Sequence, residues 1–273
     1  HDLAEREGLV FVHPYDDPLI IAGQGTVGRE MVAAAPDLGA IIVPIGGGGL
    51  IAGIAVAAKA HNPDIRIIGV EAALFPSMSQ ALAGTTPTSG GTTLAEGIAV
   101  KNPGSLTRPI VESLVDEIIL LDEAAIESAV ELMAEAAHLV VEGAGATVLG
   151  ALLARPDLFA GRRTGLVVSG GNVDMRLLAT VLLRGLVRGG QLIRLRVQIT
   201  DAPGHLAEVG RIIGDAGGNV VDIVHQRMFY NVPVKQADLD VVVETRNAAH
   251  GAAILRALAD AGLPTRVLDD SDV

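Results

Sequence analysis

The feature that most constrains this chain is a run of four glycines between an apolar segment and a helical pattern. The β-branched residues Ile41–Val43 precede the run, and an alanine-rich segment from Leu50 to Ala60 follows it. Strand, glycine loop and helix in this order commonly hold an anion, because several backbone amides can converge on one phosphate at the positive end of the helix. We therefore predict phosphate binding at residues 46–49; the alternative is a tight turn that needs glycine only for its backbone shape.

The residues around the glycines limit the kinds of ligand that the loop can bind. No Lys-Ser or Lys-Thr pair follows them, which argues against a P-loop and nucleoside triphosphate hydrolysis. The G-x-G-x-x-G spacing of a dinucleotide fold is also absent. The pattern therefore favours a single phosphate held mainly by backbone amides, as for a phosphorylated cofactor.

Composition excludes several classes of function. The net charge is −12, with two Tyr, four Phe and no Trp, so the chain has neither the basic surface nor the stacking residues of a nucleic-acid-binding protein. It has no cysteine, which excludes thiol chemistry and cysteine-ligated metal. No apolar run reaches membrane-spanning length without interruption. We expect a soluble cytoplasmic protein that binds no membrane.

From residue 9 to about residue 188, short apolar runs alternate with amphipathic segments, which predicts a parallel sheet covered by helices on both faces. The predicted strands are Leu9–Val12, Ala40–Val43, Arg66–Val70, Glu117–Leu121 and Thr164–Ser169. The predicted helices are Thr26–Ala35, Leu50–His61, Pro76–Ala83, Glu123–Ala137, Ala144–Ala154 and Met175–Leu186. The long Gly-, Thr- and Ser-rich loop between Gly84 and Gly104 suggests a functional segment.

At residues 188–191 the pattern changes, and we place a domain boundary there, giving domains 1–189 and 190–273. The tail predicts the order β-α-β-β-α-β, a ferredoxin-like unit with an antiparallel sheet. Its predicted strands are Leu192–Thr200, Val220–Met228, Asp238–Glu244 and Thr265–Leu268. The first predicted helix ends at Ala216, and the second spans Ala248–Ala261.

Polar residues at strand ends are the other candidates. Ser169 follows an apolar strand, where α/β folds place ligands, although a glycine turn would also explain it. Glu142 lies between an apolar run and a helix start, where it binds a ligand or simply favours the helix dipole. Glu71 and Glu96 are similarly ambiguous, and Glu71 is a doubtful metal ligand. None of the seven histidines forms a zinc-binding pair.

In the tail, small and polar residues cluster at two predicted turns. They are Asp201, Gly204, His205 and Leu206 at the first turn and Asn219 at the second. We expect these residues to line an amino-acid-binding cleft; the alternative is two ordinary turns and a helix cap.

Taken together, the motifs resemble those of a known family. Gly46-Gly47-Gly48-Gly49-Leu50 with Ser169-Gly170-Gly171-Asn172, Pro14-Tyr15-Asp16-Asp17-Pro18 and Glu142-Gly143-Ala144-Gly145-Ala146 are similar to the motifs of fold-type II pyridoxal-phosphate enzymes, and within these to threonine dehydratases (threonine ammonia-lyases). The tail resembles an ACT-type regulatory domain.

The resemblance implies roles for several residues. Gly46, Gly47, Gly48, Gly49 and the Leu50 amide would cradle the phosphate of pyridoxal 5'-phosphate. Ser169 would meet the pyridine nitrogen, and Glu142 would lie near the ring. Glu71 matches one ligand of a divalent-cation site in related serine racemases, but Ser77 stands where those relatives have a second carboxylate. No metal site is therefore expected.

One family feature is missing. The Schiff-base lysine stands in a Ser-Phe-Lys motif before the glycine loop, and none of Lys59, Lys101 and Lys235 has that context. The chain also opens without Met on a helix-end pattern. We expect that the N-terminal third of the enzyme is absent and that the fragment is inactive.

The resemblance implies α,β-elimination of L-threonine to 2-oxobutanoate and ammonia, and of L-serine to pyruvate, in a homo-oligomer. It also implies a tail that responds to an amino-acid effector, for which branched-chain amino acids are candidates. The alternatives are a serine racemase or serine dehydratase of the same fold and a non-enzymatic amino-acid sensor. The ACT-like tail argues against the racemase.

Overall fold

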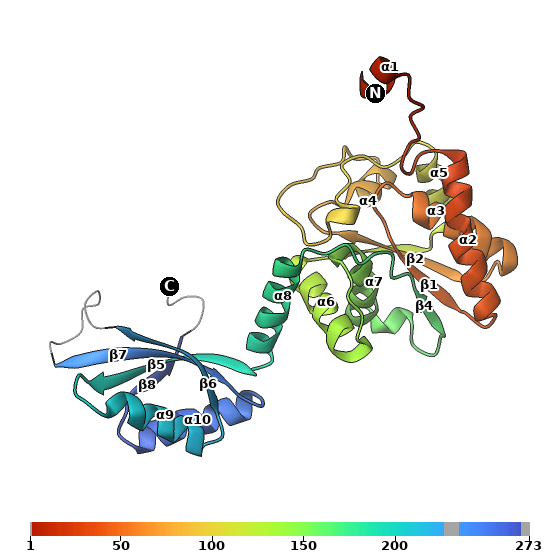
Figure 1. Cartoon of the computed structure of the whole chain (residues 1–273). Coiled ribbons are helices and arrows are strands. Elements are labelled where there is room, and N and C mark those ends of the chain that lie inside the picture. Colours follow the sequence, from red (N-terminus) through yellow and green to blue (C-terminus); the bar gives the residue numbers. More distant parts are fainter. Residues whose placement is uncertain (1, 227–234, 269–273) are drawn as a thin grey trace. The chain divides into compact units, whose positions relative to one another are not determined.

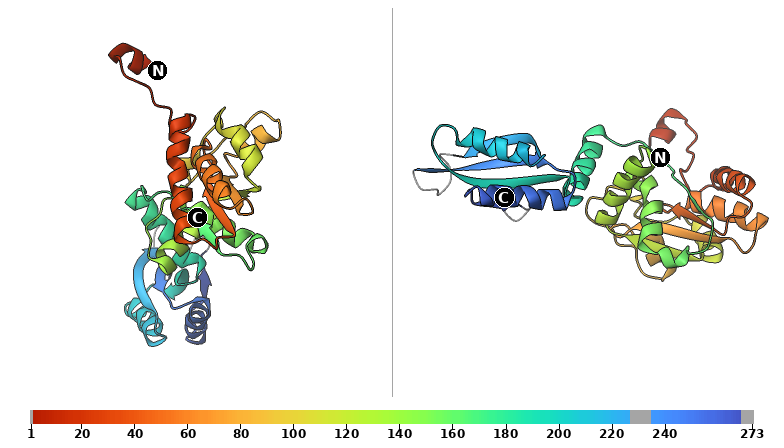
Figure 2. Two further views of the ribbon diagram at one scale, coloured as in Figure 1. Left: turned by 90° about the vertical axis from the view of Figure 1, so that its right-hand side faces the viewer. Right: turned by 90° about the horizontal axis from the view of Figure 1, so that it is seen from below.

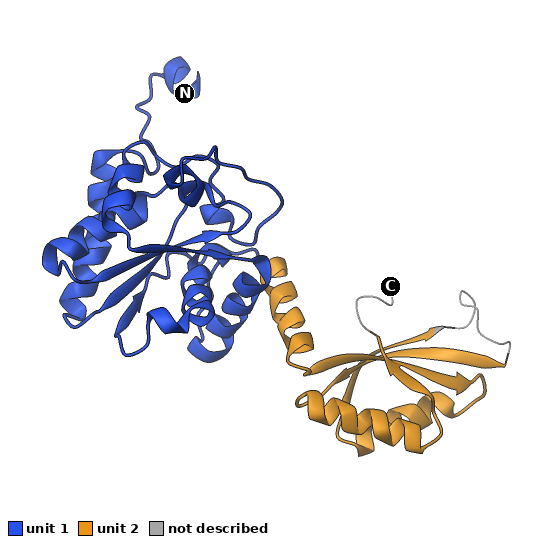
Figure 3. Ribbon diagram, turned by 180° about the vertical axis from the view of Figure 1, so that it is seen from behind, with its two compact units in different colours: residues 1–175 blue, residues 176–273 orange. Residues whose placement is uncertain are grey.

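The computed structural model describes residues 2–226 and 235–268. The chain divides into two compact units, residues 1–175 and residues 176–273 (Figure 3). Among the described residues, no helix combines the length and the apolar character needed to cross a bilayer.

The first unit is built on a sheet of four parallel strands in the order β3-β2-β1-β4, which confirms the predicted parallel α/β fold (Figure 1). The strands are β1 (Ala40–Pro44), β2 (Arg66–Ala72), β3 (Glu117–Leu121) and β4 (Thr164–Leu166). Every residue of the central strand β1 is buried. This explains why its sequence is continuously apolar, because helices cover both faces of a parallel sheet.

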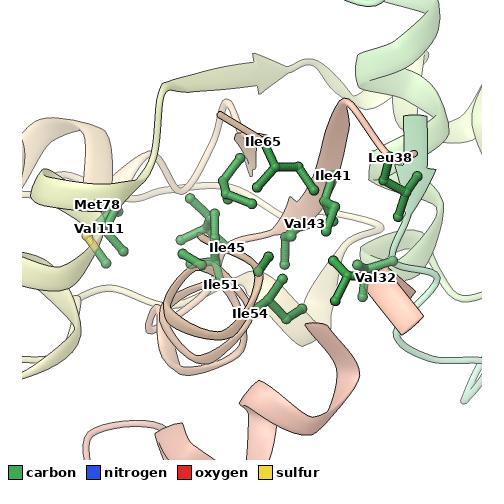
Figure 4. Packing of buried hydrophobic residues seen from close by; sticks show 14 residues of the cluster. Val32, Leu38, Ile41, Val43, Ile45, Ile51, Ile54, Ile65, Met78 and Val111 are labelled. Atoms are coloured by element: carbon green, nitrogen blue, oxygen red, sulfur yellow. The ribbon is translucent and has the colours of Figure 1, made fainter. Parts of the chain in front are cut away.

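The helices of this unit cover the two faces of the sheet, except for the first helix, which buries no residue (Figure 1). They are α1 (Asp2–Glu7), α2 (Pro18–Ala34), α3 (Gly49–His61), α4 (Ser77–Leu82), α5 (Thr107–Leu114), α6 (Glu123–Ala137) and α7 (Gly143–Ala154), with short 3-10 turns at Glu96–Ile98 and Pro156–Leu158. Ile41 and Val43 of β1 pack with Ile51 and Ile54 of α3 on one face (Figure 4). Ile42 faces the other side, among residues of α6 and α7.

Helices α2 and α3 lie side by side (Figures 1 and 2). Their close approach depends on glycine, since a Cβ on Gly53 would lie 2.7 Å from the backbone nitrogen of Gly25. The observed start of α2 differs from the predicted start at Thr26, because Asp17 caps the helix: its Oδ1 accepts hydrogen bonds from the amides of Leu19 (2.8 Å) and Ile20 (3.2 Å).

The strand predicted at Leu9–Val12 is wrong. This segment has no strand assignment and its side chains are exposed, Val10 at 90%. Its apolar and β-branched composition favours an extended backbone, but a strand also needs a partner strand, and the segment belongs to neither sheet of the described residues. Composition alone could not show this.

The second unit has the predicted order β-α-β-β-α-β and an antiparallel sheet in the order β6-β7-β5-β8, which confirms the ferredoxin-like topology. Its elements are α8 (Met175–Arg188), β5 (Leu192–Thr200), α9 (His205–Asp215), β6 (Asn219–Gln226), β7 (Gln236–Glu244), α10 (Ala248–Asp260) and β8 (Thr265–Val267). Arg227 and Met228, predicted to end the second strand, lie outside the described residues.

The boundary between the compact units differs from the predicted domain boundary. The sequence placed it after α8, at residues 188–191, whereas the units part at the start of this helix, between Met175 and Arg176. The change from alternating α/β pattern to tail pattern marks the end of the helix and carries no information about which unit the helix packs with. The catalytic and regulatory roles of the two parts stay predictions.

Candidate cofactor site

The glycine loop lies at the carboxyl end of β1, as the sequence predicts. The amide of Ile45 donates to the carbonyl oxygen of Val70 at 2.7 Å, which is the last sheet-like contact before the loop. Gly48 is the N-cap of α3 with φ +95°, a left-handed conformation that glycine adopts without steric cost. Gly47, Gly48 and Gly49 are buried.

The neighbours of the loop also require glycine. A Cβ on Gly48 would lie 2.6 Å from Cε of Met78, and one on Gly49 would lie 2.9 Å from Cβ of Tyr15. A Cβ on Gly47 would collide with the ring of Tyr15. Close packing therefore explains the glycine content by itself, and the case for anion binding depends on the backbone amides.

These amides fit a phosphate. The amides of residues 47–50 have no hydrogen-bond acceptor among the described residues. Those of Gly49 and Leu50 belong to the first turn of α3, whose positive dipole end lies at the same place. Buried amides are normally paired, so four unpaired amides on consecutive residues indicate a place for an external acceptor such as the phosphate of a cofactor.

The structure brings Ser169 and Glu142 into the same region as the loop. Strand β4 pairs with β1 in parallel, and Val167 donates to the carbonyl of Ile42 at 3.0 Å, so Ser169 lies beyond the same edge of the sheet as the glycines. The amide of Glu142 donates to the carbonyl of Gly170 at 3.2 Å. Glu142 is thus held beside the Ser169-Gly170 segment by backbone contact.

The segment Ala95–Val100 connects Glu142 with the glycine loop. A Cβ on Gly97 would lie 3.3 Å from Oε1 of Glu142, and one on Gly46 would lie 3.2 Å from Cα of Ile98. Glu142 is the N-cap of α7 but its side chain makes no capping hydrogen bond. Glu142 therefore lies next to the Ser169-Gly170 segment and to Gly97 of the segment that borders the glycine loop, and its carboxylate is not used by its own helix.

Glu71 has a structural role. It is fully buried at the end of β2, and its Oε1 accepts from the amide of Met78 at 2.7 Å, while Oε2 accepts from the amide of Ser79 at 3.0 Å and from the Ser79 hydroxyl. Burial raises the pKa of this carboxyl more than these hydrogen bonds lower it. Glu71 thus stabilises the start of α4. The described residues contain no group of three potential metal ligands.

The three lysines lie in unrelated places. Lys59 is on α3 and forms an ion pair with Asp116, with 3.1 Å between Nζ and Oδ2. Lys101 is exposed in the long loop, directly after Val100, which contacts the glycine loop. Lys235 is in the second unit, where its carbonyl accepts from the amide of Asp201 at 3.0 Å.

The five tail residues predicted to bind an effector do not form one site. His205 lines a cavity of about 370 Å³ with Gln198, Thr200, Glu208 and other residues at the end of β5. Asn219 pairs with Glu244 at the other end of the sheet and lines a different cavity. Because β5 and β6 begin at the same end, Asn219 lies a full strand length from the turn at residues 201–206.

Sequence reasoning assigned no role to three residues that contact the loop or its support: Tyr15, Asp16 and Thr107. Thr107 begins a helix, α5, that was not predicted. Its N-terminal amides are capped by Asp16, a residue 91 positions away, so no local capping signal marks the start of the helix.

The fold defines a class of protein, the parallel α/β proteins, and the unpaired amides of the glycine loop fit the phosphate of a cofactor. The family model described as pyridoxal-phosphate dependent enzyme matches residues 1–170. The chain belongs to this family, whose cofactor is pyridoxal phosphate, and this confirms the family resemblance and the cofactor predicted from the sequence.

Several known proteins are similar to the chain. An L-threonine ammonia-lyase of Geobacter sulfurreducens is 43% identical over 266 residues, covering 97% of this chain and 66% of the relative. An L-threonine ammonia-lyase of Thermotoga maritima is 39% identical over 268 residues, covering 97% of this chain and 67% of the relative. The chain therefore spans about two thirds of the length of these relatives.

Solved structures are also similar to the chain. Maize serine racemase is similar with a TM-score of 0.61 and 39% identity, covering 68% of this chain and 59% of that one. The processed form of a threonine deaminase isoform from Solanum lycopersicum has a TM-score of 0.63 and 33% identity, covering 66% of this chain and 54% of that one.

Proposed function

We propose that this chain is part of a pyridoxal-phosphate dependent L-threonine ammonia-lyase, which converts L-threonine to 2-oxobutanoate and ammonia and L-serine to pyruvate. The similarity to two L-threonine ammonia-lyases along 97% of the chain carries the proposal, because it includes the second unit as well as the cofactor site. Pyridoxal phosphate supplies the electron sink that such an elimination requires.

In this proposal the chain binds and orients the cofactor. The amides of residues 47–50 hold the phosphate, and the positive end of α3 adds attraction for its negative charge. Ser169 offers a neutral hydroxyl to the pyridine nitrogen. Such a group does not keep this nitrogen protonated as a carboxylate would, which suits prompt loss of the substrate hydroxyl over slower reactions at the same carbon.

Glu142 lies beside the ring. Its carboxylate makes no capping hydrogen bond in α7, so it is available to a donor on the bound molecule. A Cβ on Gly170 would collide with Oε1 of Glu142, so a larger residue there would displace this carboxylate.

A second candidate of the same fold is a serine racemase or serine dehydratase, which the likeness to maize serine racemase favours. The catalytic unit by itself does not separate the two. The similarity of two L-threonine ammonia-lyases to 97% of the chain, which includes the second unit, supports the ammonia-lyase.

We propose further that residues 1–273 alone do not turn over threonine. The reaction needs an amine that reacts with the cofactor and moves the substrate α-proton. Lys59 is engaged with Asp116 and Lys235 belongs to the second unit. Lys101 is exposed in the long loop and lacks the Ser-Phe-Lys context that the family resemblance implies for the reactive lysine.

For the second unit we propose an amino-acid-responsive, ACT-type role centred on the cavity at the end of β5. His205 and Glu208, joined by a contact of 3.2 Å between Nδ1 and Oε2, lie at its wall with Gln198 and Thr200. The Glu208 carboxylate can accept hydrogen bonds from the ammonium group of an amino acid, and the side chains of Gln198 and Thr200 can donate to its carboxylate. Asn219 has no part in this cavity.

The proposed reaction is tested with the product of the complete natural reading frame. Purified protein loaded with pyridoxal phosphate is given L-threonine or L-serine, and 2-oxobutanoate, pyruvate and D-serine are measured. We expect 2-oxobutanoate from threonine to exceed D-serine formation. D-serine as the main product, without 2-oxobutanoate, would establish the racemase instead.

A further inference from the structure

The carbonyl oxygen of Gly47 is held from two directions. It accepts a hydrogen bond from the amide of Gly104 at 3.0 Å and another from the hydroxyl of Thr107 at 2.7 Å, so both of its lone pairs are used. Thr107 is fully buried. In a trans peptide the carbonyl and the following N–H point in opposite directions. Fixing this oxygen therefore aims the amide of Gly48 away from Thr107.

The turn that donates these two bonds is held by Asp16. Its Oδ2 accepts from the amide and the hydroxyl of Ser105, both at 2.8 Å, and its Oδ1 accepts from the amides of Leu106 at 2.8 Å and Thr107 at 3.3 Å. Burial opposes ionisation, but these hydrogen bonds outweigh it and lower the pKa of Asp16 below its usual value. The carboxylate thus stays charged at neutral pH.

Asp16 is itself fixed beside the glycine loop. Its amide donates to Nδ1 of His13 at 2.8 Å, and the neighbouring Tyr15 lies against Gly47 and Gly49. The hydroxyl of Tyr15 donates to the carbonyl of Asn102 at 3.1 Å. Residues 13–16 and 102–107, which are far apart in the sequence, therefore form one support around the loop, here called the loop clamp.

We propose that Asp16 and Thr107 are positioning residues for the cofactor phosphate: they hold the Gly47–Gly48 peptide so that the Gly48 amide is directed at the phosphate before the cofactor arrives. This inference rests on the proposed phosphate-binding role of the loop. Asp16 acts through the Gly104–Thr107 turn, and Thr107 acts on the peptide directly.

The clamp has a definite consequence for affinity. An unclamped Gly-Gly peptide rotates easily, because glycine has the widest choice of backbone conformations, and its ordering then opposes binding. Removing one of two hydrogen bonds to the Gly47 carbonyl should weaken pyridoxal phosphate binding roughly fivefold. Pyridoxal, which lacks the phosphate, should bind equally well with or without the clamp.

The test is a ligand titration of the folded 273-residue chain, followed by the NMR shifts of the Gly47, Gly48, Gly49 and Leu50 amides. The ligands are pyridoxal phosphate, inorganic phosphate and pyridoxal. Thr107→Val removes the hydroxyl and keeps the shape of the side chain; Thr107→Ser restores the hydroxyl. The matched control is Thr147→Val, since Thr147 is equally buried and its hydroxyl donates to Ala144 at 2.7 Å, away from the loop.

A second pair of variants tests the other end of the clamp and serves if Thr107→Val does not fold. Asp16→Asn places an amide group against backbone donors, whereas Asp17→Asn changes the adjacent carboxylate, which caps α2 rather than the 104–107 turn. We expect Thr107→Val and Asp16→Asn to lower the affinity for both pyridoxal phosphate and inorganic phosphate. Thr107→Ser and the controls Thr147→Val and Asp17→Asn should keep affinities within about twofold of that of the unchanged chain.

The inference would be overturned if both clamp variants bound pyridoxal phosphate with the affinity of the unchanged chain. It would also be overturned if the clamp variants lost as much affinity for pyridoxal as for pyridoxal phosphate. A different failure concerns the loop itself. If the unchanged chain binds pyridoxal phosphate without shifts at residues 47–50, or does not bind it, the proposed cofactor loop is wrong rather than the clamp.

Discussion

Replacement of Gly48 by alanine gives the sharpest test of the loop geometry. Gly48 has φ +95°, and a Cβ there would lie 2.6 Å from Cε of Met78 and 2.7 Å from Oγ1 of Thr107. The left-handed backbone costs an alanine about 1–2 kcal/mol. Overpacking of the buried surroundings adds about 1–3 kcal/mol. Gly48→Ala should therefore lower the free energy of unfolding of the first unit by about 2–5 kcal/mol.

Gly84 provides the matched control. It lies in the same unit with φ +73°, but a Cβ there would meet nothing within 4 Å. Gly84→Ala should therefore show the backbone cost alone, about 1–2 kcal/mol. Urea denaturation with hydrogen exchange of peptides from residues 1–175 measures both variants in the same unit. Equal destabilisation by the two substitutions would refute the reasoning, because it would mean that Met78 and Thr107 do not crowd the loop.

Three further outcomes are expected. Gly48→Asp should lower the affinity for pyridoxal phosphate at least tenfold (~1.4 kcal/mol), because a carboxylate would face the cofactor phosphate; an unchanged titration would count against the loop. Glu71→Gln should destabilise the first unit, by an amount that shrinks as pH rises above the ordinary pKa of a glutamate. Burial raises the pKa of Glu71, so the native state keeps its proton to higher pH than the unfolded state, and this contribution to stability is lost as pH increases through the raised pKa. An unfolding difference independent of pH would contradict this. Isoleucine or valine should raise the melting temperature of the second unit, by the equivalent of ~2.7 kcal/mol at a hundred times the dissociation constant; no shift with any of the twenty amino acids would remove the proposed effector role.

Segments whose own residues favour one structure were predicted well. Strand β3 and helix α6 have the predicted bounds, because β-branched residues and a regular helical period act locally. The segment Leu9–Val12 has equally strong local preference, yet forms no strand, since pairing depends on a neighbour that the sequence of the segment does not encode.

The site was predictable where it depends on the chain's own backbone and unpredictable where it depends on distant contacts. Four glycines before a helix indicate a cluster of free amides, and the structure has it. The support of the Gly47 carbonyl by Thr107, and of Thr107 by Asp16, joins residues separated by 60 and 91 positions. Such contacts leave no periodic or compositional pattern, so only the fold reveals them.

The central claim is that the amides of residues 47–50 hold the phosphate of pyridoxal phosphate. A crystal structure of the chain grown with pyridoxal phosphate tests it directly. We expect phosphate oxygens about 2.7–3.2 Å from the amide nitrogens of the loop, with the pyridine nitrogen facing Ser169 and the ring beside Glu142. A phosphate bound elsewhere, with the loop amides still unpaired, would contradict the account.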